Sequence, residues 1–128
     1  MERDLSHVYW IGGSGCSGKS SIVRLLQKEQ GFTAYDCDDH WGEHELRSNP
    51  VEHPGTIRIK ANFEEYLRLA PAEFVEASRA WFREDFAMVL EDLDAMPSEK
   101  IVVEGVIITD ESSTLSGNLD LVKQHFDL

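Results

Sequence analysis

The chain has 128 residues, of which 24 are acidic and 12 are basic, so its formal net charge at neutral pH is −12. Hydrophobic residues make up 41% and charged residues 28%, a balance typical of a soluble globular domain. The acidic excess argues against nucleic acid or anionic membranes as partners, because both need a basic face. No apolar run approaches the roughly 18 residues that span a bilayer. We expect one cytoplasmic domain over residues 1–128.

The first half of the chain predicts a strand, a helix and a second strand. Residues 7–11 form a short β-branched and aromatic run that ends at two glycines, as a buried strand would. Residues 19–30 carry apolar side chains at helical spacing, and Gly31 is suited to cap the helix. Residues 32–37 predict a second strand with acids crowded at its end. The stretch 48–56 contains two prolines and a glycine and predicts a surface loop.

The second half predicts two helices and a third strand. Asn62 with Glu65 three residues later resembles a capping box for a short helix. Pro71 suits the first turn of a longer helix whose apolar stripe ends before Pro97. Residues 100–109 are almost continuously apolar, which is typical of a strand covered on both faces. Helices between strands imply a parallel sheet, so the fold class predicted is a layered α/β domain.

A glycine-rich phosphate loop is the strongest signal in the sequence. Residues 13–20 read GSGCSGKS and match G-x-x-x-x-G-K-[ST] at every position, directly after a predicted strand and at the start of a predicted helix. Successive backbone N–H groups in such a loop bind phosphate oxygens. Lys19 would reach the β- and γ-phosphates, and the Ser20 hydroxyl would bind Mg²⁺. The alternative is a flexible turn with a surface lysine. The predicted nucleotide-binding residues are Gly13, Ser14, Gly15, Cys16, Ser17, Gly18, Lys19, Ser20 and Ser21.

Acids come after the second strand, at the sheet edge where ligands bind. On an extended backbone Asp36 and Asp38 would face the same way and Cys37 the opposite way. We expect Asp38 to act as the base or to orient the acceptor, and Asp36 to assist the metal, because phosphoryl transfer needs both an oriented nucleophile and a charge-neutralising cation. The alternative is a solvated acidic turn.

Glu104 is the one charged residue between Ile101 and Ile108. A charge in a buried strand is costly unless it is paired or lies at a polar site. The crevice at the carboxyl end of the sheet would provide such a site, through Mg²⁺, its waters or Lys19. The alternative is an edge-strand glutamate that faces solvent.

Two weaker patterns remain open. Arg79 and Arg83 lie one helical turn apart and could clamp an anionic acceptor, although pairing with Glu76 or solvation explains them equally well. His40 and His44 have zinc-like spacing, but no third ligand is apparent. A loop or short helix that lines the acceptor pocket is the favoured interpretation of this histidine segment.

Taken together, these motifs resemble the small P-loop kinases, the group that includes shikimate, gluconate and adenylate kinases. The matching residues are Gly13 to Ser20, the D-x-D pattern of Asp36 to Asp38, and the pair Glu104-Gly105. The resemblance implies a three-layer α/β/α fold with strand order 2-3-1 and Mg-ATP or Mg-GTP as donor. It also implies Asp38 on the acceptor and Ser20, Asp36 and Glu104 around the metal.

The chain departs from this group after Glu104-Gly105, where 23 residues remain and none is arginine. Such kinases continue with further strands, an arginine-bearing lid and an adenine loop, so the expectation is a C-terminally incomplete kinase. The function predicted is transfer of a γ-phosphoryl group to a hydroxyl of a small metabolite. The alternative is a non-catalytic or weakly hydrolytic nucleotide-binding module. Exposed sheet edges would also allow a homodimer.

Overall fold

The computed structural model describes residues 7–12, 19–97 and 100–105. Two sequence predictions fall outside the described residues. These are the glycine-rich loop over residues 13–18 and the part of the predicted third strand beyond Gly105. The elements on either side of the loop are described, so its placement between a strand and a helix can be tested.

A small parallel sheet forms the centre of the fold. It contains β1 (Val8–Gly12), β2 (Thr33–Asp36) and β3 (Ile101–Gly105), in the order β1-β3-β2. The order 2-3-1 describes the same neighbours counted from the opposite edge, with β3 in the centre. All five residues of β3 are buried, which explains why this strand is a nearly unbroken apolar run.

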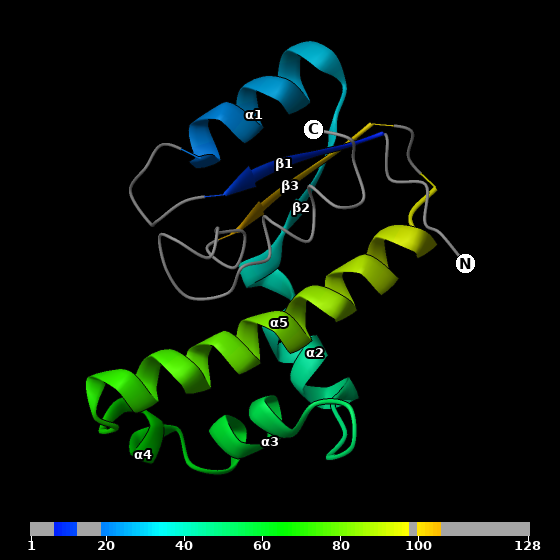
Figure 1. The fold of residues 1–128 in the computed structure, drawn as a ribbon. Helices are drawn as coiled ribbons and strands as arrows, with labels where there is room; N and C mark the ends of the chain where they lie inside the picture. Colours follow the sequence, from blue (N-terminus) through cyan, green and yellow to red (C-terminus); the bar gives the residue numbers. More distant parts are fainter. Residues whose placement is uncertain (1–6, 13–18, 98–99, 106–128) are drawn as a thin grey trace.

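Helices cover both faces of the sheet (Figure 1). Helix α1 (Lys19–Gln30) packs on one face, and α5 (Pro71–Ala95) crosses the other. The mixed α/β class and the parallel sheet are therefore confirmed. The main hydrophobic core lies between the sheet and the C-terminal half of α5. Its buried members are Val8, Tyr35, Cys37, Phe82, Phe86, Val89, Leu90, Leu93, Ile101 and Val103.

The apolar face of α1 is only partly used in the described structure. Val23 is 4% exposed, whereas Ile22 and Leu25 remain 50% and 56% exposed. The predicted helix boundaries are confirmed, since α1 ends at Gln30 and Gly31 comes next with a φ of 71°. Glycine reaches this left-handed conformation without the steric penalty of a Cβ atom.

Between β2 and α5 the chain forms four short helical elements, which is more than the sequence predicted. A single 3-10 turn, η1 (Cys37–His40), leads directly into α2 (Trp41–Arg47). Helices α3 (Pro54–Ala61) and α4 (Phe63–Leu67) come next. They pack on the first half of α5 around Ile59, Tyr66 and Ala77, which form a second, smaller core.

The predicted loop at residues 48–56 is too long by three residues, because α3 already begins at Pro54. Proline suits the first turn of a helix. The carboxylate of Glu84 on α5 then accepts hydrogen bonds from the N–H groups of Gly55 and Thr56, at 2.9 and 2.7 Å. An anionic cap from a distant helix stabilises this N-terminus, and no local sequence pattern indicates it.

Two other helix boundaries are confirmed. The Asn62 side chain accepts a hydrogen bond from the N–H of Glu65 at 3.0 Å and so caps α4. Helix α5 starts at Pro71 and ends at Ala95, two residues before Pro97. Although α5 has 25 residues, neither it nor any other helix in the described part is apolar enough to cross a membrane.

Candidate functional site

An open pocket of about 400 Å³ lies at the carboxyl ends of the strands, between α1 and the end of β2. Parallel strands present their carboxyl ends at one edge, where α/β proteins bind ligands. Most of the side chains around this pocket are polar or charged. The lining residues are Ser20, Val23, Arg24, Gln27, Ala34, Asp36, Asp39, His40 and Glu104.

Two carboxylates meet in this pocket because of the strand register. Asp36 on β2 is paired directly with Glu104 on β3, and both side chains line the pocket. Glu104 is only 7% exposed. Adjacent like charges on neighbouring strands destabilise a sheet unless a cation or a proton lies between them. Asp36 and Glu104 thus offer carboxylate oxygens of the kind that can hold a divalent cation.

Helix α1 forms the opposite wall. Ser20, Val23, Arg24 and Gln27 recur at intervals of three and four residues, so they share one face of the helix. Ser20 lies in the first turn, directly after the predicted phosphate loop. The prediction that the loop connects a strand to a helix is confirmed, since β1 ends at Gly12 and α1 begins at Lys19.

The donor set fits magnesium better than zinc. Within the described ranges, no group of three or more histidine, cysteine, aspartate and glutamate residues could hold a metal ion. Mg²⁺ does not require such a cage, because it is commonly bound by one or two carboxylates together with waters and substrate phosphates. Asp36, Glu104 and the Ser20 hydroxyl offer that kind of partial shell. The zinc interpretation of His40 and His44 has no support here.

The prediction that Asp36 and Asp38 lie side by side on an extended strand is wrong. The strand ends at Asp36, and the chain turns at once into η1. The Asp36 carboxylate caps this turn by accepting a hydrogen bond from the Asp38 N–H at 2.9 Å. Aspartate side chains commonly compete for backbone N–H groups in this way. As a result Asp39 and His40 line the pocket, and Asp38 is not among its lining residues.

The two arginines proposed as an acceptor clamp are on α5, which packs on the other face of the sheet from α1. Arg79 forms an ion pair with Glu76 at 3.4 Å, the alternative that the sequence left open. Arg83 is exposed. Neither arginine is among the described residues that line the pocket, whereas Arg24 on α1 is.

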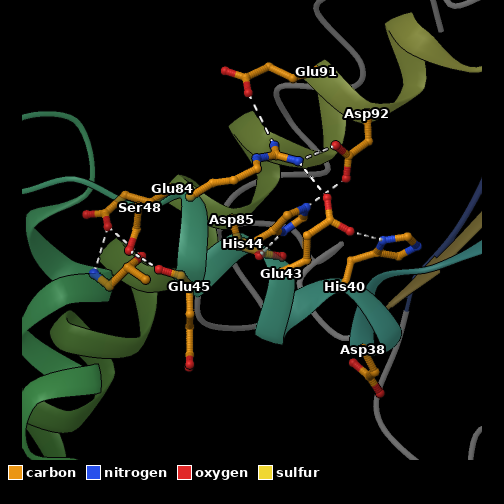
Figure 2. Close-up of polar contacts among 12 residues, drawn as sticks. Asp38, His40, Glu43, His44, Glu45, Ser48, Glu84, Asp85, Glu91 and Asp92 are labelled. Carbon is orange, nitrogen blue, oxygen red and sulfur yellow. Dashed lines mark hydrogen bonds and ion pairs between the residues drawn. The ribbon is translucent and has the colours of Figure 1, made fainter.

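A buried polar network on the α5 face was not predicted. It centres on His44, which is 1% exposed. Its Nδ1 lies 2.6 Å from Asp85 Oδ1, and its Nε2 lies 2.7 Å from Asp92 Oδ2. Figure 2 shows the imidazole of His44 on α2 between these two carboxylates of α5. A ring with a carboxylate at each nitrogen is held as a doubly donating imidazolium.

The charges of this network perturb its pKa values. Burial alone would lower the pKa of His44, but hydrogen bonds and charges from Asp85 and Asp92 outweigh burial and raise it. Burial alone would raise the pKa of Asp92, but hydrogen bonds from Tyr35, His44 and Arg47 lower it. Both directions stabilise the charged forms, so the network favours the ionised forms of His44 and Asp92.

The network extends to β2 and to the surface. The Tyr35 hydroxyl donates to Asp92 Oδ2 at 2.5 Å, and Arg47 donates to Asp92 Oδ1 at 2.8 Å. Burial, together with the neighbouring Asp92, raises the pKa of Tyr35, so its hydroxyl stays protonated. The pKa of the Cys37 thiol is also raised, mainly by burial, so this cysteine is no candidate nucleophile.

One sequence signal could have located this network. Asp85 and Asp92 are seven residues apart and lie within the apolar stripe of α5, which contains Phe86 and Val89. An acid within an apolar helix face needs a buried partner. His44 is distant in sequence, and nothing in the pattern around it indicates that it is that partner.

Comparison of the chain with protein-family models, with curated proteins and with solved structures found no match. The chemistry and the geometry of the pocket are therefore the basis for assigning a function.

Proposed function

We propose that this protein is a kinase-type phosphotransferase of the P-loop class, which transfers the γ-phosphoryl group of Mg-ATP or Mg-GTP to a hydroxyl of a small molecule. The observation that carries the proposal is the paired register of Asp36 and Glu104. Both acids line a pocket together with Ser20, the last residue of the G-x-x-x-x-G-K-S motif. The oxygens that we propose as metal ligands thus line the same pocket as the residue at which the motif ends, as a site for Mg²⁺ and nucleotide phosphates requires.

The charge balance supports the same conclusion. An acidic protein can bind a polyanionic nucleotide only where local positive groups offset its net charge. The backbone N–H groups of the glycine-rich loop, the Lys19 ammonium and a Mg²⁺ ion would provide them. Asp36, Glu104 and Ser20 would hold that ion, which would neutralise phosphate charge during the transfer.

The proposal is tested by measuring ADP formation from Mg-ATP over a panel of sugars, hydroxy acids and nucleosides. Lys19→Ala is expected to lower turnover by about 10²–10³-fold, because it removes a charge that stabilises the transferring phosphoryl group. Lys28→Ala is the matched control, since Lys28 is an exposed lysine in the last turn of the same helix and does not line the pocket. Equal turnover in the Lys19→Ala variant and the wild type would refute the assignment.

Calorimetry separates the kinase from a binding module. Both functions require the wild type to bind Mg-ATP, and both require Lys19→Ala to weaken that binding. A kinase also forms ADP faster when its acceptor is present. Tight nucleotide binding with no acceptor-dependent ADP formation across the panel would favour the non-catalytic module.

A further inference from the structure

His40 occupies the wall of the pocket that the acceptor would face. It comes from η1, at the end of β2, and its side chain is 32% exposed. Its Nδ1 lies 3.8 Å from the Glu43 carboxylate one turn later. No described residue hydrogen-bonds to its Nε2, and the ring's polar edge is therefore available to a ligand in the pocket.

The ring of His40 is oriented by stacking on the ring of Tyr35. It stacks on the ring of Tyr35 with a centroid distance of 4.1 Å and an interplanar angle of 2°. Tyr35 is 3% exposed, and its hydroxyl is bound to Asp92 in the His44 network. The hydrogen bond to Asp92 therefore links the ring that stacks on His40 to α5. A group that reacts in one defined geometry needs such support.

Asp38 and His40 project in different directions from the same turn, as Figure 2 shows. Asp38 donates its backbone N–H to Asp36 and is not among the residues that line the pocket. His40 lines the pocket beside Asp36 and Asp39. The 3-10 turn thus brings the imidazole, in place of the second acid of the D-x-D pattern, into the lining of the pocket.

We propose that His40 is the catalytic residue that receives the acceptor, an inference that rests on the function proposed above. Its Nε2 accepts a hydrogen bond from the acceptor hydroxyl and takes the proton as the hydroxyl oxygen bonds to the γ-phosphorus. The bond from the γ-phosphorus to the bridging oxygen of the β-phosphate breaks, and ADP leaves with that electron pair. The proton passes from His40 to solvent after product release. Imidazole is the side chain most often used for such transfers near neutral pH.

The proposal is tested with water as the acceptor, because hydrolysis of Mg-ATP needs no identified substrate. Phosphate release is measured for the wild type, His40→Gln, Asp38→Asn and His7→Gln. We expect His40→Gln to lower hydrolysis by about 10²-fold, the smaller end of the range for loss of a general base. Its affinity for Mg-ATP should be unchanged in calorimetry. His7→Gln is the matched control, because His7 lies at the amino end of β1, away from the pocket. Hydrolysis at the wild-type rate in His40→Gln, or a larger loss in Asp38→Asn, would overturn the proposal.

A second measurement uses the wild-type protein and does not depend on how the variants fold. The imidazole ¹⁵N resonances are recorded as Mg-ADP is added, first alone and then with aluminium fluoride, which mimics the transferring phosphoryl group with water in line. The His40 resonances should shift with aluminium fluoride and far less with Mg-ADP alone. Nucleotide binding with unchanged His40 resonances would refute the role of His40 alone, whereas absence of nucleotide binding would refute the proposed function as well.

Discussion

The two faces of the sheet both carry carboxylates, but the two sets are compensated differently. On the α1 face, Asp36 and Glu104 are register partners beside an open pocket. On the α5 face, Asp85 and Asp92 hold His44 between them in the interior. The pocket beside Asp36 and Glu104 has room for a cation from solution. The cation between Asp85 and Asp92 is the imidazolium of His44. We interpret the acids that are paired in the interior as structural, and the acids that line the open pocket as the candidate binding set.

The largest effect should come from removing the internal cation. His44→Leu leaves Asp85 and Asp92 without their shared imidazolium, and breaking a buried ionic set costs about 3–5 kcal/mol. We expect a loss of that size in the free energy of unfolding, measured by urea titration. Arg47→Gln is the control from the exposed end of the same network, where Arg47 pairs with Glu43, Glu91 and Asp92 and each exposed ion pair contributes less than about 1 kcal/mol. Equal losses in both variants would mean that the buried histidine is not the essential member.

Removal of the Tyr35 hydroxyl should have the next largest effect. Tyr35→Phe keeps the ring beneath His40 but deletes the hydrogen bond to Asp92. A buried hydrogen bond to a charged group contributes about 1.5–3 kcal/mol. Because His44 and Arg47 still donate hydrogen bonds to Asp92, we expect the free energy of unfolding to fall by the lower end of this range. If urea titration shows no loss, the hydroxyl does not anchor the ring.

The pH dependence of stability should show a smaller, graded effect of the same network. Because the pKa of His44 is raised in the folded state, its stabilisation is complete below the unfolded value of 6.5 and is lost as the pH rises through the folded pKa. The free energy of unfolding should fall by up to about 1.4 kcal/mol per pH unit in that window.

The groups that face His44 are Asp85, Asp92, Tyr35 and His40. The lowered pKa of Asp92 adds stability above its ordinary value of 3.8 that is lost only as the pH falls through the folded pKa. Measurements should stay between about pH 5.5 and 8.5, because the Cys37 thiol begins to titrate in the unfolded chain near its ordinary pKa of about 8.5. A His44→Gln variant should lack the decline above pH 6.5. A decline of the same slope in that variant would assign it to another group.

The smallest effect is expected on the α1 face, and its sign is opposite. Glu104→Gln removes one of two neighbouring like charges, which should change the unfolding free energy by about 0.2–1 kcal/mol in the stabilising direction without metal. The same variant should bind Mg²⁺ with ATP more weakly in calorimetry, because a carboxylate ligand is lost. Clear destabilisation with unchanged Mg²⁺ affinity would place Glu104 among the structural acids and erase the contrast between the two faces.

Patterns confined to neighbouring residues predicted much of this molecule. The apolar run of β3, the spacing of α1 and the cap at Asn62 are local, because backbone hydrogen bonding and burial act on the residues that carry them. Because parallel strands share one carboxyl edge, the sequence predicted that Ser20, Asp36 and Glu104 lie near one another. All three line the same pocket. The sequence did not predict the turn at Asp36. A capping hydrogen bond from the Asp36 side chain competes with a longer strand, and the packing of the following helix determines which of the two conformations forms.

Local sequence is enough to predict the α/β class, the central strand, the order of the main elements and the acids at one sheet edge, because each depends on periodicity or on a short motif. Tertiary packing is needed to bring His40 rather than Asp38 to the pocket, and to place His44 between two acids that lie 41 and 48 residues further along the chain. The placements of His40 and His44 depend on α5 packing against β2 and α2. Partners that are distant in sequence also set the energy of a buried charge.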